Sequence, residues 1–298
     1  MFRGASLGFA LSILGIVLGL IAALAWNSRL ALGKFGWRFL WGTTWDPVAE
    51  IFGALPFIYG TLVTSAIGLL IAVPLGLGTA IFLAELAAPR VSEFIGFLVE
   101  LLAAIPSVIY GLVGVFVVVP WVRTVIGPGL SGAFGWLPLF QGTPYGVGLL
   151  TAGMILAAMV VPFITTVSRE VLLAVPRAQR EAALALGATH WEVVWTSILP
   201  YARSGIVGSI FLALARALGE TMAVTMVVGN RPEIKASLLE PGYTMAAVLA
   251  NEFTEATSDL YLHALVEIGL VLFGITFLVN GAARLMLLRM GRVQEVRA

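Results

Sequence analysis

Arg216 and Glu220 are the residues whose type and position most clearly suggest chemistry, because they lie inside an otherwise apolar stretch, residues 206–228. At a spacing of four, their side chains would share one face of a continuous helix. An arginine offers an oxyanion a planar fork of donors, and a neighbouring glutamate can orient the guanidinium. The spacing therefore fits an anion-passing pair, and it also fits a structural ion pair that fixes helix register.

Three further ionisable residues lie in apolar sequence. Glu100 shares a helical stripe of small residues with Ser107, and such a face suits either a polar path or an interhelical hydrogen bond. His263 and Glu267 are one helical turn apart near the start of the last apolar stretch, which indicates an interfacial pair. A charge at bilayer depth is costly unless it faces protein or water, so these helices are expected to line a polar environment.

The composition places these residues in a membrane. Of 298 residues, 60% are hydrophobic and 11% are charged, whereas soluble domains carry roughly 25% charged residues. So few polar side chains cannot cover a soluble globule, which excludes a soluble enzyme, a nucleic-acid-binding protein and a disordered chain. The net charge of +1 implies no field for polyanions, and a chain with no cysteine and two histidines is expected to hold no metal site.

Six apolar stretches are long enough to cross a bilayer as helices, which takes about 20 residues each. They cover residues 6–26, 60–84, 94–119, 147–167, 206–228 and 262–288. Because the linkers are short, we expect one all-α, polytopic membrane domain over residues 1–298, with its core over about residues 55–290. The first stretch follows a basic residue, as a signal peptide does, but exceeds the usual core of about 7–15 residues, so we expect it to be retained.

The distribution of charge between the linkers predicts the orientation. With the N-terminus inside, ten arginines fall on the cytoplasmic side and six basic residues fall outside. Most acidic linker residues then lie outside, and six of the eight tryptophans lie at or beyond the outer interface. Both termini are therefore predicted to be cytoplasmic.

The longest inner linker, residues 169–204, has the pattern of two short helices joined by a bend. Pro176 suits a first helical turn, and Gly187 suits a left-handed stop. Thr189 and Glu192 have the spacing of a capping box that starts the second helix. The composition fits an amphipathic elbow lying on the membrane, and its small side chains also fit docking into the groove of a partner.

The same linker carries the three parts of a docking motif: Glu181-Ala182-Ala183, Gly187 and Leu199-Pro200. This pattern resembles the EAA loop of ABC-importer permeases, which docks on a separate ATPase subunit. Ser197 departs from the pattern, which usually has isoleucine there. Pro200 is expected to end the second helix of the elbow just before the fifth span. The resemblance implies the six-span fold of a type I importer permease.

A second resemblance narrows the substrate. Residues 215–230, which include Arg216, Glu220 and Thr221, resemble the fifth-span signature of phosphate-specific permeases, and residues 53–62 and 103–111 are similar to the same family. The likeness extends from about Leu55 to the C-terminus. It implies a phosphate path at Arg216 and Glu220. A cation there agrees with the chemistry, since a doubly charged oxyanion needs one in a medium of low dielectric constant. We add Thr221, Glu100 and Ser107 to the expected path.

The resemblance also implies partners and a location. A bacterial inner-membrane importer of this kind pairs a permease with a sister permease (PstA type), two ATPase subunits (PstB type) and an external phosphate-binding protein (PstS type). This chain has no Gly-x-x-x-x-Gly-Lys-Ser/Thr run, so ATP and magnesium are expected on the partner, and the chain itself is expected to be neither an enzyme nor a cofactor-binding protein.

Three other functions remain open on the sequence. The chain could be an ABC permease for another anion, such as phosphonate, sulfate or molybdate. A secondary transporter with Glu100, Glu220 and Glu267 as proton carriers is a second alternative. An intramembrane hydrolase would need paired acids at one depth, and no motif supports it.

Overall fold

The computed structural model describes residues 2–295, with side chains described for residue 4 and residues 6–288. In this part of the chain, six helical runs are long and apolar enough to cross a membrane: Ser6–Asn27, Leu55–Leu86, Ser107–Phe134, Leu149–Leu173, His190–Leu218 and Asp259–Leu288. The described residues form helices and two isolated bridges, so the all-α, six-span prediction is confirmed.

The spans are built from the following elements: α1 (Phe2–Asn27), α4 (Leu55–Ile81) with η1 (Phe82–Leu86), α6 (Ser107–Val113) through η2 (Gly114–Val118), α7 (Val119–Trp121) and η3 (Val122–Ile126) to α8 (Gly127–Phe134), α9 (Leu149–Leu173), α11 (His190–Val193) with η5 (Val194–Ile198) and α12 (Leu199–Leu218), and α15 (Asp259–Glu295). The shorter elements are α2 (Arg29–Phe35), α3 (Arg38–Trp41), α5 (Pro89–Ala103), η4 (Pro138–Phe140), α10 (Arg177–Ala185), α13 (Met222–Thr225) and α14 (Met245–Glu252).

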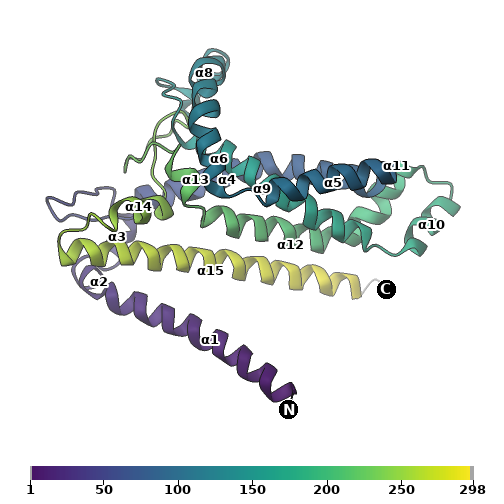
Figure 1. Ribbon diagram of the computed structural model, residues 1–298, viewed down its shortest axis with the longest axis horizontal. Helices are drawn as coiled ribbons and strands as arrows, with labels where there is room; N and C mark the ends of the chain where they lie inside the picture. The colour runs from purple at the N-terminus through teal and green to yellow at the C-terminus, as the bar shows by residue number, and fades with distance from the viewer. Residues whose placement is uncertain (1, 296–298) are drawn as a thin grey trace.

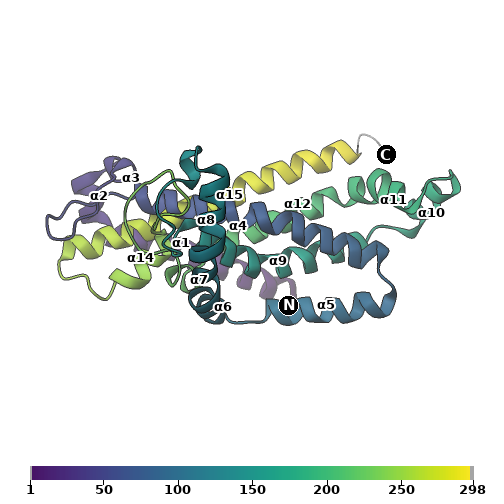
Figure 2. The ribbon, with the colours of Figure 1, turned by 90° about the horizontal axis from the view of Figure 1, so that it is seen from above.

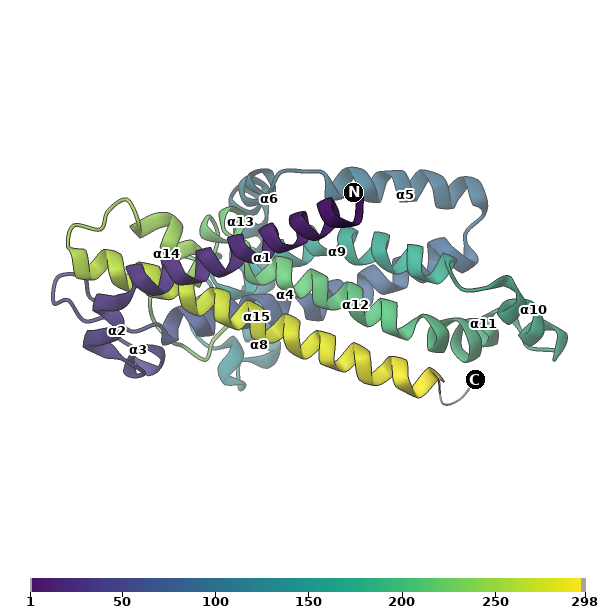
Figure 3. The ribbon, with the colours of Figure 1, turned by 90° about the horizontal axis from the view of Figure 1, so that it is seen from below.

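Five short helices lie at the two ends of the molecule. In Figure 1, α2, α3 and α14 lie at one end of the long axis, and α10 and α11 lie at the other. The first turn of α1 and the last turn of α15 both point toward the α10–α11 end. α1 packs against α15 and α2 and diverges from the rest of the bundle in Figure 1, while Figure 3 shows it crossing the face of the bundle that is seen from below.

The third predicted span, residues 94–119, is wrong in its position. Pro106 has no N–H to donate and disfavours a helical residue before it. The helix accordingly stops at Ala103, the end of α5, and restarts at Ser107. The run from α6 to α8 then continues to Phe134 and crosses the other long helices at a steep angle (Figures 1 and 2). Pro74 and Pro162 behave differently, because they lie inside α4 and α9 without ending them.

The fifth predicted span, residues 206–228, is shifted in the opposite direction. α12 ends at Leu218 with Gly219 as its C-terminal cap, and the short helix α13 begins only at Met222. At its other end the helical run reaches back through η5 to His190. Pro200 therefore does not end the second helix of the elbow. It lies in the first turn of α12, where a missing N–H is tolerated, directly after the π-helical turn η5.

Helix α9 is the centre of the bundle. In its most apolar stretch 61% of residues are buried, against none in the corresponding stretch of α1. Glycines bring it close to α4, because a β-carbon at Gly68 or Gly76 would press on Leu156 or Ile164. On another face, the Ser168 and Ser209 hydroxyls are 2.9 Å apart and join α9 to α12. Side chains on α9 are therefore held by neighbours on several sides.

A second core lies at the α2–α3–α14 end. Trp45 packs edge-on against Phe52 and Phe57, and its indole N–H donates to Glu252 over 2.8 Å. The Tyr261 hydroxyl donates to the same carboxylate oxygen over 2.6 Å. The half-buried Glu252 therefore ties the segment before α4 to α14 and α15.

Gly60, on α4, allows the closest backbone approach in this region. A β-carbon there would overlap the carbonyl oxygen of Tyr243, which is backbone and cannot rotate away. We expect Gly60→Ala to destabilise the protein by about 1–3 kcal/mol, the usual cost of overpacking. The measurement is the thermal unfolding midpoint of the purified protein in detergent.

Gly78→Ala is the matched control on the same helix, because its β-carbon would meet open space. Alanine has the better helix propensity, so this variant should unfold at the wild-type temperature or slightly above it. A midpoint for Gly60→Ala equal to that of Gly78→Ala would contradict the packing described for α4.

Candidate functional site

Three of the predicted path residues lie in or next to the break between α12 and α13. Arg216 lies in the last turn of α12, where a cation complements the partial negative charge of the helix C-terminus. Glu220 lies in the break itself, and its Oε1 accepts a hydrogen bond from the backbone N–H of Ala223 over 3.2 Å. The Thr221 carbonyl accepts from the Thr225 hydroxyl over 2.7 Å. The break is thus closed by groups of this chain.

The prediction that Arg216 and Glu220 share one helical face is wrong, because the helix ends between them at Leu218. Among the described ion pairs, none joins the two side chains. Glu220 serves instead as a cap for α13. The Arg216 guanidinium is exposed, and its Cζ lies 6.0 Å from the ring centre of Phe163 on α9. A structural ion pair therefore does not explain this arginine.

Ser107 is the first residue of α6, a helix that packs against α13. A β-carbon at Gly111 would contact Met226 and Ala223, so α6 packs closely against α13. Ser107 precedes Gly111 by four residues and hence lies on the same face of α6. The end of α5 is also closed here, since the Tyr110 hydroxyl donates to the Leu102 carbonyl over 2.8 Å. A helix break therefore directly precedes each of the two helices that make the α6–α13 contact.

Glu100 lies nearer the elbow. It is exposed on α5 and lines a small cavity of about 10 Å³ together with Thr165, Thr166 and Arg169 of α9. Thr166 follows Phe163 by three residues, so along α9 this cavity is about one turn beyond the level of Arg216. The structure places Glu100 beside the same central helix as Arg216, although it does not bring the two into contact.

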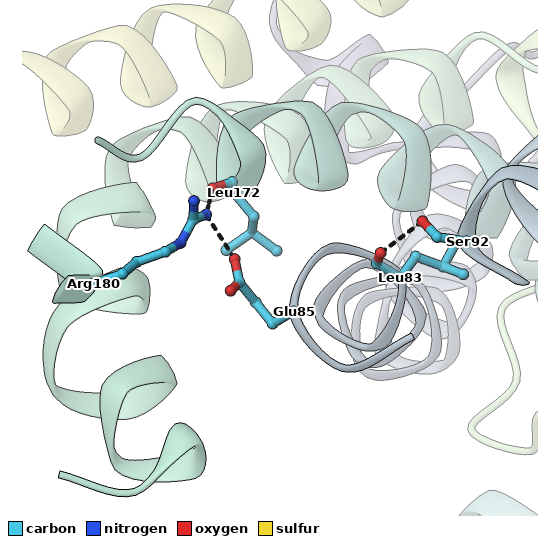
Figure 4. Close-up of polar contacts among 5 residues, drawn as sticks. All are labelled: Leu83, Glu85, Ser92, Leu172 and Arg180. Carbon is cyan, nitrogen blue, oxygen red and sulfur yellow. Dashed lines mark hydrogen bonds and ion pairs between the residues drawn. The ribbon is translucent and has the colours of Figure 1, made fainter. Parts of the chain in front are cut away.

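Arg169 was missed as a site residue, because the sequence placed it at the start of a polar linker. It lies instead within α9, and its Nη2 donates to the Ser92 hydroxyl over 3.1 Å. Ser92 in turn donates to the Leu83 carbonyl over 2.7 Å, as Figure 4 shows. The sequence does contain a signal for this position. No helix breaker lies between Pro162 and Pro176, so the fourth helix could extend past its last apolar residue and include Arg169.

The elbow has the predicted helix–glycine–helix form. α10 ends at Ala185, and Gly187 adopts the left-handed conformation with φ of +85°. The capping box is present: Thr189 N–H donates to Glu192 Oε2 over 2.7 Å, and Glu192 N–H donates to Thr189 Oγ1 over 3.4 Å. In the single chain Glu181 and Ala182 are exposed and Ala183 is half-buried.

Ser197, the departure from the docking motif, has a defined contact. Its hydroxyl donates to the Gln179 carbonyl of α10 over 3.2 Å. The substitution of a polar residue for isoleucine therefore joins the two arms of the elbow by a hydrogen bond. Leu199 and Pro200, the last part of the motif, form the start of α12.

His263 and Glu267 do not form the expected pair. The His263 Nδ1 and the Glu267 Oε2 are both buried and have no hydrogen-bond partner among the described residues. Glu267 is 3% exposed and lines an apolar cavity of about 730 Å³ between α2, α3, α4 and α15. Glu267 therefore packs among α2, α3 and α4, whereas Arg216 lies against α9.

Comparison with known proteins agrees with this arrangement. Residues 72–292 match the family described as the inner membrane component of binding-protein-dependent transport systems, and the chain belongs to that family. It is 50% identical over 293 residues to the phosphate transport system permease protein PstC of Mesorhizobium japonicum, covering 97% of this chain and 90% of that protein. The PstC protein of Pasteurella multocida is 46% identical over 97% of this chain and 91% of its own length.

Solved structures share the fold. A chain of the MetNI methionine ABC transporter in an inward-facing conformation superposes with a TM-score of 0.57 at 18% identity, covering 83% of this chain and 99% of that one. A chain of a bacterial ABC transporter for alginate import gives a TM-score of 0.56 at 17% identity, covering 94% of this chain and 92% of that one. The type I importer-permease fold predicted from the elbow motif is confirmed, and with it a transporter subunit whose ATPase is a separate chain.

The cap at α13 can be tested directly. Glu220→Ala removes the acceptor for the Ala223 N–H, and loss of a helix cap costs about 1 kcal/mol. We expect a lower unfolding midpoint for the purified protein than for Glu255→Ala, which removes an exposed acid after α14. If the two variants unfold at the same temperature, Glu220 does not cap this break.

Proposed function

We propose that this chain is the permease subunit of an ATP-driven importer of inorganic phosphate. The observation that carries the proposal is the exposed Arg216 guanidinium at the α12 break, in a chain 50% identical to a phosphate transport permease over almost its whole length. An arginine without an acidic partner, set among apolar helices, is suited to meet an oxyanion that passes through. Binding there must stay weak enough for release.

The path that we propose runs past Arg216, Glu220 and Thr221 at the α12–α13 break, with Ser107 on the opposing helix α6. Glu100 lies further toward the elbow, beside Arg169. Two helix ends with exposed polar groups would give an anion successive weak sites rather than one tight one. Glu220 contributes to this path by holding α13 in place rather than by orienting Arg216.

Energy would reach this path through the elbow. Glu181, Ala182, Ala183 and Gly187 would dock into an ATPase subunit, while Leu199 and Pro200 connect the elbow to α12 without a break. Closure of the ATPase pair on ATP would shift the elbow and re-tilt the spans, so that the path opens to alternate sides. ATP and magnesium belong to the partner, and this chain binds no cofactor.

The full assembly would contain a sister permease, two ATPase subunits and an external phosphate-binding protein. We place it in the bacterial inner membrane with both termini in the cytoplasm, on the same side as the elbow. The common direction of α1, α15 and the elbow in Figure 1 supports this orientation. Import of another anion is the main alternative, and competition by sulfate, molybdate or phosphonate for phosphate uptake would separate the two.

Arg216 carries the first functional prediction. Arg216→Gln removes the charge at the break, and we expect phosphate uptake by the assembled complex to fall by about 10- to 100-fold, as when a hydrogen bond to a charged group worth roughly 1.5–3 kcal/mol is lost. Uptake of radiolabelled phosphate into proteoliposomes is the measurement. Arg284→Gln, which changes an exposed arginine on α15, is the control and should transport normally. Normal uptake by Arg216→Gln in an intact complex would remove Arg216 from the path.

The second functional prediction concerns Gly187. At a φ of +85° a β-branched residue is strained, whereas asparagine tolerates the left-handed region. We expect Gly187→Val to reduce co-purification of the ATPase subunit several-fold, and Gly187→Asn to retain it. Because a β-carbon at Gly187 meets open space, a steric clash within this chain cannot explain the difference. Equal co-purification for both variants would show that the bend does not shape the docking surface.

A further inference from the structure

Besides its apolar packing, the elbow is joined to two of the membrane spans by the hydrogen bonds of one arginine. Arg180, in α10, donates from Nη2 to Glu85 Oε1 over 2.8 Å and to the Leu172 carbonyl over 2.8 Å, as Figure 4 shows. The Arg180 and Glu85 side chains are 22% and 12% exposed, respectively, so water competes little for these bonds. The contact links residues far apart in the sequence, and the docking motif does not include it.

Both acceptors are at helix ends on the elbow side. Glu85 lies in the π-helical turn η1 that completes the second span, and Leu172 lies in the last turn of α9. These two spans pack against each other along their length. Since helix C-termini carry partial negative charge, a guanidinium between them attracts both ends at once. A shift of α10 would therefore act on η1 and α9 together.

A second set of bonds extends the unit to α5. Ser92 of α5 donates to the Leu83 carbonyl of η1, and Arg169 of α9 donates to Ser92. The turn between η1 and α5 is thus held from both sides. Further along, α5 carries Glu100, one of the proposed path residues. The chain of contacts from the elbow to the path consists of Arg180, η1 and α5.

We propose that Arg180 is the positioning residue that transmits displacement of the elbow to the α4–α5 turn. The inference rests on the proposed function, in which an ATPase subunit docks on the elbow. A guanidinium holding two acceptors in fixed directions resists both separation and sliding, which a flexible point charge does not. The π-helical turn η1 lies between Arg180 and α5, and such turns occur frequently at functional sites.

The test uses the whole complex, with its sister permease, ATPase subunits and binding protein, in proteoliposomes. We expect Arg180→Met to assemble and to hydrolyse ATP, while phosphate uptake per ATP falls at least about five-fold, the lower end of typical coupling between sites. Arg180→Lys keeps the charge without the fixed donor directions of the planar guanidinium and should recover part of the loss. Glu85→Gln keeps an acceptor oxygen and should lie between wild type and Arg180→Met.

Lys34→Met is the matched control. It removes an ion pair with Glu50 at the other end of the molecule, where both side chains are exposed, and should leave uptake per ATP unchanged. Wild-type uptake per ATP in Arg180→Met would overturn the inference. Loss of ATPase co-purification in Arg180→Met, with full coupling in Arg180→Lys, would also overturn it, because Arg180 would then only shape the docking surface. If the wild-type complex takes up no phosphate, the proposed function fails instead.

A distance measurement separates transmission from assembly. The chain has no cysteine, so Ala88→Cys at the α4–α5 turn and Ala178→Cys on α10 can carry the sole pair of spin labels on it. With Arg180 present, we expect the distance between labels to stay constant when ATP is bound and hydrolysed. In Arg180→Met it should change with nucleotide. A distance that varies equally in both proteins would contradict a rigid link.

Discussion

A helix that stops inside an apolar layer exposes backbone N–H and C=O groups that lipid cannot satisfy, and the rest of this structure depends on how those groups are satisfied. α5 stops at Ala103 and α12 stops at Leu218. At the first break the Tyr110 hydroxyl donates to the Leu102 carbonyl, and at the second the Glu220 carboxylate accepts from the Ala223 N–H. The polar groups needed at the breaks also form the polar surroundings in which an exposed Arg216 can be tolerated.

Helix α9 gives these breaks a fixed reference. It is the most buried span, and it contacts Arg216 through Phe163 and the Glu100 cavity through Thr165 and Thr166. At its elbow end, the Leu172 carbonyl accepts from Arg180. The proposed path and the proposed point of energy input are therefore attached to the same helix. This arrangement lets a small displacement at the elbow reach the path without unfolding either break.

Much of the fold could be predicted from the sequence, because apolar length and turn chemistry are local signals. Six spans, the left-handed Gly187 and the capping box at Thr189 all follow from such signals. The positions of the breaks did not, since proline has context-dependent effects: Pro106 ends a helix, Pro162 lies within one, and Pro200 begins one. The separation of Arg216 from Glu220 follows from the helix end at Leu218, which an uninterrupted apolar pattern conceals.

Contacts between distant segments were beyond sequence reasoning altogether. Arg180 and Glu85 are 95 residues apart, and neither has a local pattern that indicates the other. Glu267 was expected at an interface with His263, and tertiary packing instead buries it beside an apolar cavity. Membership of the transport family likewise identifies the elbow without saying which side chains attach it to the spans.

The central claim is that this chain is a passive path, moved by work delivered from another subunit. The most direct measurement is phosphate accumulation in vesicles that contain this chain and its sister permease, before and after the ATPase subunits, binding protein and ATP are supplied. The account predicts no accumulation against a gradient until all of them are present. Concentrative uptake by the two permease chains alone would contradict it.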